Sequence, residues 1–398
     1  MIEKFVPNFE KSCIIRFSNS EHKFVTGSQS PVIAVGEKVH RSDLCLAYKA
    51  FSESALLETL HICKSNGSRV TCFKDFSLVR NPAVTMEEWN HNISSFTHFV
   101  IAGIPEIQDI KSRIILFVLF LVIYTITVIE NLIFIIVIKS DHGLHSPMYL
   151  FICNLAILDL LIPSVTVPEM LYYLITEDRS IAFGPCITQM AFYLTFLVTE
   201  AVTLVVMAYD RYQAICNPLH YPTVMTTKHA FMLSALCWMV GCVRTIPYIY
   251  FVLNAPFCGP NRIEYFCCDY VSIMLLACAD VSVESTYDKI VSLMLITVQL
   301  FLILFSYRKI TVEVSKISSS EGQRKAFSTC ASHLLVISVF YLAVVFVLIS
   351  YSVPGFSEQV RTLAALVQNV LPPLANPVIY CIKTKEIRTS ITKLIKKY

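Results

Sequence analysis

Residues 207–221 read MAYDRYQAICNPLHY, and they mark the place where a long apolar run of the chain ends. The charged pair Asp210 and Arg211 closes this run, and Pro218 follows soon after. Charges at the end of a run of about 20 apolar residues can lie where lipid gives way to water, without full desolvation. A simple stop signal would also explain the pair, because basic residues flank most spanning helices on the cytoplasmic side. Either way, the stretch predicts the inner end of a transmembrane helix.

The composition of the chain indicates a polytopic membrane protein. Of the 398 residues, 55% are hydrophobic and 15% are charged, and the mean hydropathy is +0.61. Soluble proteins of this length contain more charge and fewer apolar residues. The formal net charge of +3 is small, and no basic block is interleaved with aromatic residues as in a nucleic-acid groove. We therefore expect no nucleic-acid partner.

From residue 114 onward, apolar runs alternate with short polar loops. Each run is near the length that crosses about 30 Å of hydrocarbon. The predicted spans are 114–138, 147–174, 186–212, 229–253, 284–308, 327–350 and 359–382. The chain is thus predicted to be all-α, with a bundle of seven transmembrane helices over residues 114–382.

Basic residues predict the orientation of this bundle. One set of loops is poor in them, with Arg179, Arg262 and Arg361. The other side is richer, with Lys139, Lys228, Lys309, Lys316, Arg324, Lys325 and the basic residues of the tail. By the positive-inside rule, the N-terminus lies outside and the C-terminus inside. In the tail, residues 383–398, apolar residues recur at helical spacing among lysines, which predicts an amphipathic helix on the inner leaflet in contact with membrane lipid.

Residues 1–113 contain no apolar run long enough to span a membrane, and two explanations are open. A mispredicted start is one: initiation at Met86 leaves residues 86–113 as a short extracellular segment with a glycosylation sequon at Asn92. The other is a real extracellular extension, with a sequon at Asn66 and four cysteines that suit an oxidising compartment. We favour the first, with residues 1–85 either mispredicted or disordered.

Three more motifs accompany residues 207–221. They are HSPMYLF at 145–151, RKAFSTCASHL at 324–334 and PLANPVIY at 373–380. All four resemble the motifs of odorant receptors, a branch of the rhodopsin-like G-protein-coupled receptors, and the resemblance covers nearly all of residues 92–390. It implies a plasma-membrane receptor for a small-molecule odorant. It also implies activation of a heterotrimeric G protein of the olfactory stimulatory type, which raises cyclic AMP.

The resemblance further implies a ligand pocket in the outer half of the bundle. Apolar stripes of this kind are more often simple helix packing, but walls rich in Tyr, Leu and Val favour a small, largely apolar molecule. We expect no cofactor and no metal. The candidate ligand contacts are Tyr193, Leu194, Leu197, Val198, Val291, Leu295, Tyr341, Val344, Leu348 and Asn369.

Polar groups within membrane spans are candidates for signalling. By resemblance, Asn131, Asp159, Asn376, Pro377 and Tyr380 form a helix switch, in which Pro377 removes a backbone donor and kinks its helix. An interhelical clamp is the alternative for Asn131 and Asp159.

At the inner ends of the helices, the resemblance implies a surface for G-protein coupling. Its residues are Asp210, Arg211, Tyr212, Tyr307, Arg324 and Lys325. Two further ionisable residues within the spans, Glu130 and Arg244, receive no role.

The long loop after the fourth span carries several cysteines, which indicates a disulfide-stapled lid whose connectivity the sequence does not fix. The resemblance to the second outer loop of odorant receptors implies the pairs Cys186–Cys268 and Cys258–Cys278. Cys267 is then left as a buried free thiol.

Other functional classes have no support in the sequence. The chain holds no His-Glu-x-x-His, Gly-x-Ser-x-Gly or Gly-x-Gly-x-x-Gly motif, so an enzyme is not expected. Transporters often show internal repeats, and the two halves of this chain show no such symmetry.

Overall fold

The computed structural model describes residues 14–17, 20–23, 32–35, 61–66, 69–73, 97–103, 109–176, 179–257, 261–352 and 355–397. They belong to two units, one of residues 1–96 with 256–259 and one of the remaining residues. In the first unit the described elements are short strands. These are β1 (Ile14–Phe17) antiparallel to β2 (Ser20–Lys23), and β3 (Val32–Val35) parallel to β4 (His61–Asn66), which pairs antiparallel with β5 (Arg69–Phe73). Asn92 lies outside the described residues.

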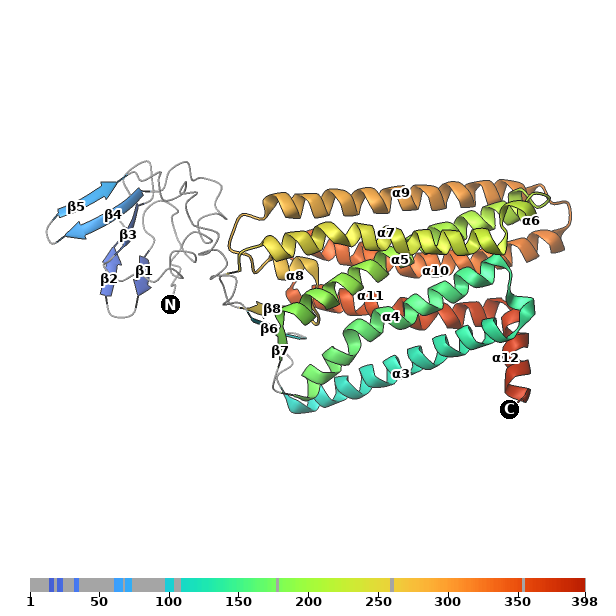
Figure 1. Ribbon diagram of the computed structural model, residues 1–398, viewed down its shortest axis with the longest axis horizontal. Coiled ribbons are helices and arrows are strands. Elements are labelled where there is room, and N and C mark those ends of the chain that lie inside the picture. The colour runs from blue at the N-terminus through green and yellow to red at the C-terminus, as the bar shows by residue number, and fades with distance from the viewer. Residues whose placement is uncertain are drawn as a thin grey trace. The chain divides into compact units, whose positions relative to one another are not determined.

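The second unit is a helix bundle. Seven of its helices are long and apolar enough to cross a membrane, and they lie along one another in Figure 1. The prediction of an all-α fold with seven spanning helices is therefore confirmed. The helices are α3 (Ile110–Ser140), α4 (Pro147–Ile175), α5 (Phe183–Cys216), α7 (Thr227–Asn254), α9 (Ser282–Ser315), α10 (Ser320–Ser352) and α11 (Glu358–Lys383).

Most of these helices extend beyond the predicted spans. α9 continues to Ser315 rather than 308, and α10 begins at Ser320 rather than 327. Hydropathy detects only the part of a helix within lipid, whereas the backbone hydrogen bonds continue into water through polar residues with adequate helix propensity. The inner ends of α9 and α10 thus project past the membrane boundary.

Helix α5 organises the packing, because it lies against α4, α7 and α9. Gly241 of α7 permits a close approach of α7 to α5. A Cβ atom at this position would lie only 2.6 Å from the carbonyl oxygen of Thr195 in α5. The hydroxyl groups of Thr195 and Thr245 are also within hydrogen-bonding distance, at 3.0 Å. α7 therefore packs closely against α5.

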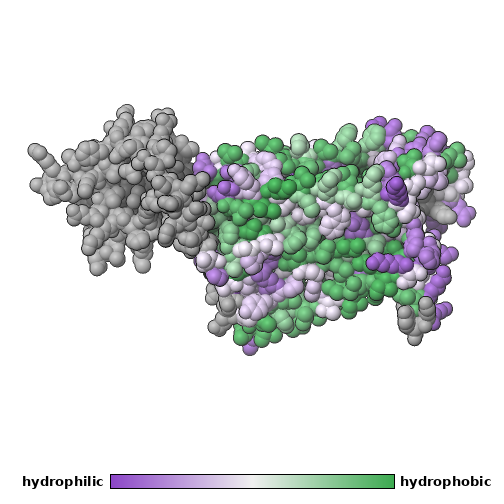
Figure 2. Space-filling view, in the orientation of Figure 1, coloured by the Kyte–Doolittle hydropathy of each residue, from purple (hydrophilic) through white to green (hydrophobic). Residues whose placement is uncertain are grey.

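The two ends of the bundle differ in structure (Figure 1). One end carries a small sheet in the order β7 (Ser180–Ala182), β6 (His98–Ile101) and β8 (Arg262–Ile263), together with α8 (Tyr270–Met274). The other carries the short helices η1 (His142–Leu144) and α6 (Tyr221–Val224) and the terminal helix α12 (Lys385–Lys397). In Figure 2, hydrophobic residues cover much of the helix sides, and hydrophilic residues gather at the end with α6 and α12. This distribution suits a bundle surrounded by lipid.

Helix α12 is docked on the first inner loop. The hydroxyl group of Ser390 donates a 2.7 Å hydrogen bond to Asp141, and Lys393 lies 3.6 Å from the same carboxylate. Hydrogen bonds from Ser390 and Gly143 and the nearby Lys393 charge hold the pKa of Asp141 below its usual value. Ile387 is fully buried, so α12 is fixed by apolar as well as polar contacts.

Candidate ligand-binding and signalling sites

A disulfide and a buried amide hold the outer loop over the bundle. Cys186, in the first turn of α5, is joined to Cys268, and both residues are fully buried. Gln189, one turn further along α5, accepts a 2.7 Å hydrogen bond from the backbone N–H of Cys268. Its amide group also donates to the carbonyl of Val165 in α4, at 2.9 Å. The loop is thus attached to α5 both covalently and by a hydrogen bond, and the same Gln189 side chain joins α5 to α4.

The other loop cysteines differ from one another. Cys278 is disulfide-bonded, and its expected partner Cys258 lies outside the described residues. Cys267 is a free, buried thiol. Burial, together with the negative charges of Asp269 and Glu169, raises the pKa of this thiol well above its usual value. A protonated buried thiol is a poor nucleophile, so Cys267 is protected from disulfide exchange.

The segment before the first span contributes the central strand of the lid. β6 pairs antiparallel with β7 and parallel with β8, and Phe99 and Ile101 are fully buried. Arg179 donates to the carbonyl of Ala102 at 2.9 Å. The sequence did not predict this sheet, because strands of two to four residues carry no periodic signal.

The predicted ligand contacts of α5 fall into two groups. Tyr193 and Leu197 pack in a hydrophobic cluster with Leu158, Phe196 and Trp238 of α4, α5 and α7. Leu194 and Val198, like Leu197, are half-buried. Packing among helices accounts for Tyr193 and Leu197.

On α9 and α10, the candidate contacts include one polar link. The hydroxyl group of Tyr341 donates a 3.1 Å hydrogen bond to Gln299 of α9, and both side chains are buried. Val291 and Leu295 of α9 and Val344 and Leu348 of α10 are half-buried.

Asn369 of α11 is fully buried and accepts a 3.0 Å hydrogen bond from Thr166 of α4. Its amide nitrogen has no partner among the described residues. A small cavity at the outer ends of α3 and α4 is lined by other residues, among them Arg113, Tyr173 and Phe266.

The predicted switch residues meet in the middle of the bundle. Asn376 of α11 donates to both carboxylate oxygens of Asp159 in α4, at 3.1 Å each. Asn131 of α3 donates to the carbonyl of Pro373, at 3.0 Å. Pro377 lies within α11. Two helices are therefore tied by amide groups to the proline-rich part of a third.

Further polar groups in this region lack protein partners. Within the described part of the chain, one oxygen each of Glu130, Glu200 and Asn376 and the hydroxyl group of Tyr380 are buried without a hydrogen bond. Buried polar atoms of this kind commonly bind ordered water. Glu130, for which no role was expected, thus belongs to the same polar region of the bundle.

At the inner end of α5, Arg211 is paired with its neighbour. Its Nε donates a 3.0 Å hydrogen bond to Asp210 Oδ2, and its Nη2 donates to the same oxygen. Tyr221 of α6 donates to the other oxygen, Oδ1, at 2.9 Å. Arg211 is 8% exposed and Asp210 only 1%, so the pair lies at a partly dehydrated boundary, where its attraction is stronger than in water.

The other predicted coupling residues surround this pair unevenly. Tyr307 is buried, and its hydroxyl group has no partner in the described part of the chain. Tyr212 is half-buried and Arg324 is exposed. The backbone of Lys325 belongs to α10, but its side chain lies outside the described residues.

Comparison with known proteins agrees with the resemblance that the motifs indicated. A family model described as "Olfactory receptor" matches residues 120–397. Olfactory receptor 6N1 of Homo sapiens is 38% identical over 306 residues, which cover 77% of this chain and 97% of the relative. The chain belongs to the olfactory receptor family. Olfactory receptor 6B9 of Mus musculus is 37% identical over 305 residues, covering 76% of this chain and 95% of the relative.

Membership of the olfactory receptor family confirms several predictions. The chain is a G-protein-coupled odorant receptor and not an enzyme. It is a multi-pass protein of the plasma membrane. The family resemblance inferred from the motifs is likewise confirmed.

Sequence reasoning missed several polar residues of this olfactory receptor. Gln189 and Gln299 lie within apolar spans, and that position alone could have marked them as candidates. Trp238 of α7 donates a 2.9 Å hydrogen bond to Asn154 of α4, which in turn donates to Thr203 of α5 at 3.1 Å. No local pattern predicts such a three-helix link, because its members are far apart in the sequence.

Proposed function

We propose that this olfactory receptor binds a small, largely apolar odorant in the outer half of its bundle and activates a stimulatory G protein that raises cyclic AMP. The observation that carries the proposal is the pairing of Arg211 with Asp210 at the inner end of α5. A guanidinium held by an adjacent carboxylate can be released when α10 moves outward. The opening would admit the C-terminal helix of a G protein as an amphipathic helix in a groove.

The outer half of the bundle supports the ligand part of the proposal. Leu194, Val198, Val291, Leu295 and Val344 lie in the outer halves of three helices and are half-buried rather than closely packed. Such surroundings favour binding by apolar burial with few polar contacts. Between the two ends, the amide contacts of Asn131 with Pro373 and of Asn376 with Asp159 join α3 and α4 to α11, and we propose that they change partners when a ligand binds.

The test is a screen in cells that carry the olfactory stimulatory G protein and a cyclic AMP reporter. A panel of neutral volatile compounds should contain at least one that raises cyclic AMP in receptor-bearing cells and not in cells without the receptor. Arg211→Ala should reach the surface and fail to respond. Arg262→Ala is the matched control, because Arg262 is an exposed residue of the outer loop. No response to any compound at normal surface expression would contradict the proposal.

We also propose that translation begins at Met86, that Asn92 carries a glycan and that α12 rests on lipid of the inner leaflet. Strand β6 lies downstream of Met86, so a chain that begins there keeps the central strand of the lid. Expression from Met1 and from Met86 in parallel, with enzymatic removal of N-glycans, tests the first two points. A chain from Met86 that fails to reach the surface would contradict the proposed start. A chain that is unchanged by the enzyme would contradict the glycan at Asn92.

A further inference from the structure

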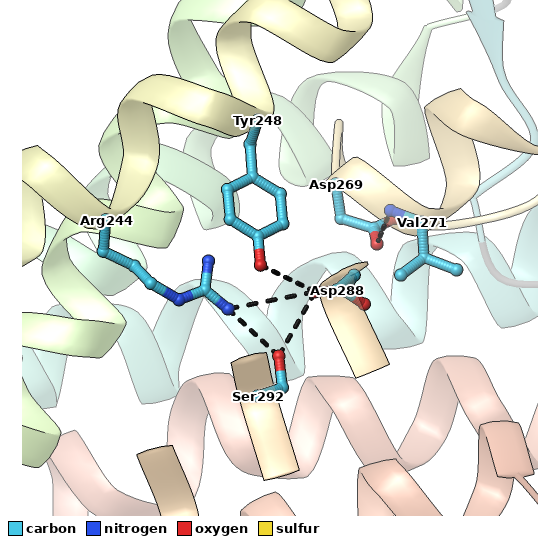
Figure 3. Close-up of polar contacts among 6 residues, drawn as sticks. All are labelled: Arg244, Tyr248, Asp269, Val271, Asp288 and Ser292. Atoms are coloured by element: carbon cyan, nitrogen blue, oxygen red, sulfur yellow. Dashed lines mark hydrogen bonds and ion pairs between the residues drawn. The ribbon is translucent and has the colours of Figure 1, made fainter. Parts of the chain in front are cut away.

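A polar cluster connects the outer halves of α7 and α9 (Figure 3). Nη2 of Arg244 donates a 3.0 Å hydrogen bond to Ser292 and lies 3.8 Å from Oδ1 of Asp288. The same oxygen of Asp288 accepts from the hydroxyl groups of Tyr248 at 3.0 Å and Ser292 at 3.2 Å. The guanidinium carbon of Arg244 lies 4.2 Å from the centre of the Tyr248 ring. Arg244, Tyr248, Asp288 and Ser292 are called the Arg244 cluster below.

The two charges of the cluster depend on each other. The side chain of Arg244 is 11% exposed and that of Asp288 is 24% exposed. An ionised group within a membrane span is costly unless it is paired or reaches water. Nε and Nη1 of Arg244 are buried without a hydrogen-bond partner among the described residues, so the Nη2 contacts and the Tyr248 ring hold this guanidinium. The pair is therefore expected to keep α7 and α9 in a fixed register.

Helix α7 is closely attached to the rest of the bundle near this contact. Gly241 and Thr245, which flank Arg244, attach α7 closely to α5, as described above. Tyr248 is also buried, and its ring lies against that of Tyr270 in the outer loop. Three contacts, those of Arg244 with Ser292 and Asp288 and that of Tyr248 with Asp288, thus join α9 to a helix that is itself attached to α5.

Helix α9 also packs along α5, but its buried residues, from Gln299 to Val314, lie in its inner half. The outer half of α9 is therefore less enclosed by the bundle. Residues such as Ile290 and Leu293 are 60% and 66% exposed and face the surroundings.

One stripe of α9 faces the other way. It follows the spacing i, i+3, i+4, i+7 and i+11, which places its members on one helix face, and they are Asp288, Val291, Ser292, Leu295 and Gln299. Val291 therefore lies beside the Arg244 cluster, and Leu295 lies between this cluster and the Gln299–Tyr341 hydrogen bond further inside.

We infer that the Arg244 cluster holds the outer half of α9 against α7 and thereby sets the positions of Val291 and Leu295 for odorant recognition. The cluster residues are positioning residues, which act on the ligand through the placement of α9. This inference rests on the proposed function for its ligand part. Its structural part, the attachment of α9 to α7, does not.

The structural part is tested by a distance measurement that needs no ligand. A spin label is attached through an unnatural amino acid at Tyr250 of α7 and Ile290 of α9, which are 62% and 60% exposed, in the full chain in lipid nanodiscs. Asp288→Ala leaves Arg244 unpaired and could prevent folding. The decisive variant therefore combines Arg244→Met with Asp288→Leu, which removes both charges together. Lys289→Gln is the matched control, because Lys289 is the exposed neighbour of Asp288.

We expect a narrow distance distribution in the wild type and in Lys289→Gln, and a broad one in the double variant. With an agonist from the neutral volatile panel, the double variant should need a concentration about tenfold higher or more for half-maximal cyclic AMP. Its maximal response and surface amount should be unchanged.

A narrow distribution in the double variant would overturn the inference, as would a broad distribution with an unchanged half-maximal concentration. If the wild type responds to no compound, the proposed function fails. The distance distribution then decides by itself whether the cluster holds α9.

Discussion

The hydroxyl group of Tyr221 donates a 2.9 Å hydrogen bond to Oδ1 of Asp210. The other oxygen of this carboxylate is the acceptor for Arg211. Asp210 therefore connects α6, in the second inner loop, to the guanidinium that is proposed to serve G-protein coupling. A change in the loop can alter the pairing of Arg211 without touching Arg211 itself.

Tyr221→Phe tests this connection. The change keeps the ring and removes one hydrogen bond, which contributes about 1 kcal/mol, so basal cyclic AMP should rise by up to about fivefold. Asp210→Asn should raise it further, because it weakens the charge pair as well. Tyr209→Phe is a suitable control, since the partner of the Tyr209 hydroxyl group among the described residues is Gln213, in the same helix α5. Basal signalling equal to that of the wild type in both Tyr221→Phe and Asp210→Asn would mean that the pair does not restrain the receptor.

Arg211→Lys separates signalling from a purely structural role. Lysine keeps the charge but lacks the planar head that presents two nitrogens to one carboxylate. We expect normal surface expression and a cyclic AMP response near background. A membrane stop signal needs only a basic residue at this place, so a normal response of Arg211→Lys would leave Arg211 with that role alone.

Tyr341→Phe removes the hydrogen bond between α10 and α9. The buried oxygen of Gln299 then loses its partner, at a cost of about 1–3 kcal/mol. We expect normal surface expression and a shifted half-maximal concentration. Gln299→Leu should shift it in the same direction, and the double variant should be less than additive, because both changes remove one contact. Unchanged concentration dependence in Tyr341→Phe would exclude the residue from the site.

The sequence predicted those parts of the fold that depend on local patterns. Each span is a continuous apolar run, and its length is set by the thickness of the membrane. The pairing of Arg211 with Asp210 joins neighbouring residues, so it could also be expected from the sequence. The predicted ends of the helices were less accurate, since α10 begins in polar residues that hydropathy does not detect.

Contacts between distant residues were predictable only through family resemblance or not at all. Asn376 and Asp159 are 217 residues apart, and only the motifs implied that they meet. Arg244 and Asp288 belong to no motif, and they lie on different helices, α7 and α9. Single polar residues in apolar helices show that a partner is needed. They do not show which helix supplies it.

The outer loop allows variants of bridged cysteines to be compared with a variant of a free cysteine. Cys186→Ser or Cys268→Ser should abolish surface expression, because loss of a native disulfide typically costs about 2–5 kcal/mol. Cys267→Ser should be nearly silent, since this thiol is free. Surface staining of the three variants in one experiment tests the assignment. Peptide mapping that finds Cys267 in a disulfide with Cys186 would reverse it.

Asp269 should make the stability of the lid depend on pH. Its carboxylate caps α8, accepting from the backbone N–H groups of Val271 at 3.1 Å and Ser272 at 3.3 Å. Burial nevertheless raises the pKa of Asp269 to about 6, whereas the pKa of an aspartate in an unfolded chain is about 4. Between these values the folded receptor binds more protons than the unfolded chain. The contribution of Asp269 to the free energy of unfolding is therefore full below about pH 4 and is lost as the pH rises through about 6.

Thermal unfolding of the purified receptor in detergent, at one scan rate and at several pH values across this window, measures the effect. The wild-type midpoint should fall as the pH rises. Asp269→Asn keeps a side-chain acceptor for the cap but does not titrate, so its midpoint should fall less steeply. Asp280→Asn, a change at an exposed aspartate of the same loop, should behave like the wild type. An equal slope in Asp269→Asn and in the wild type would show that Asp269 is not the group responsible.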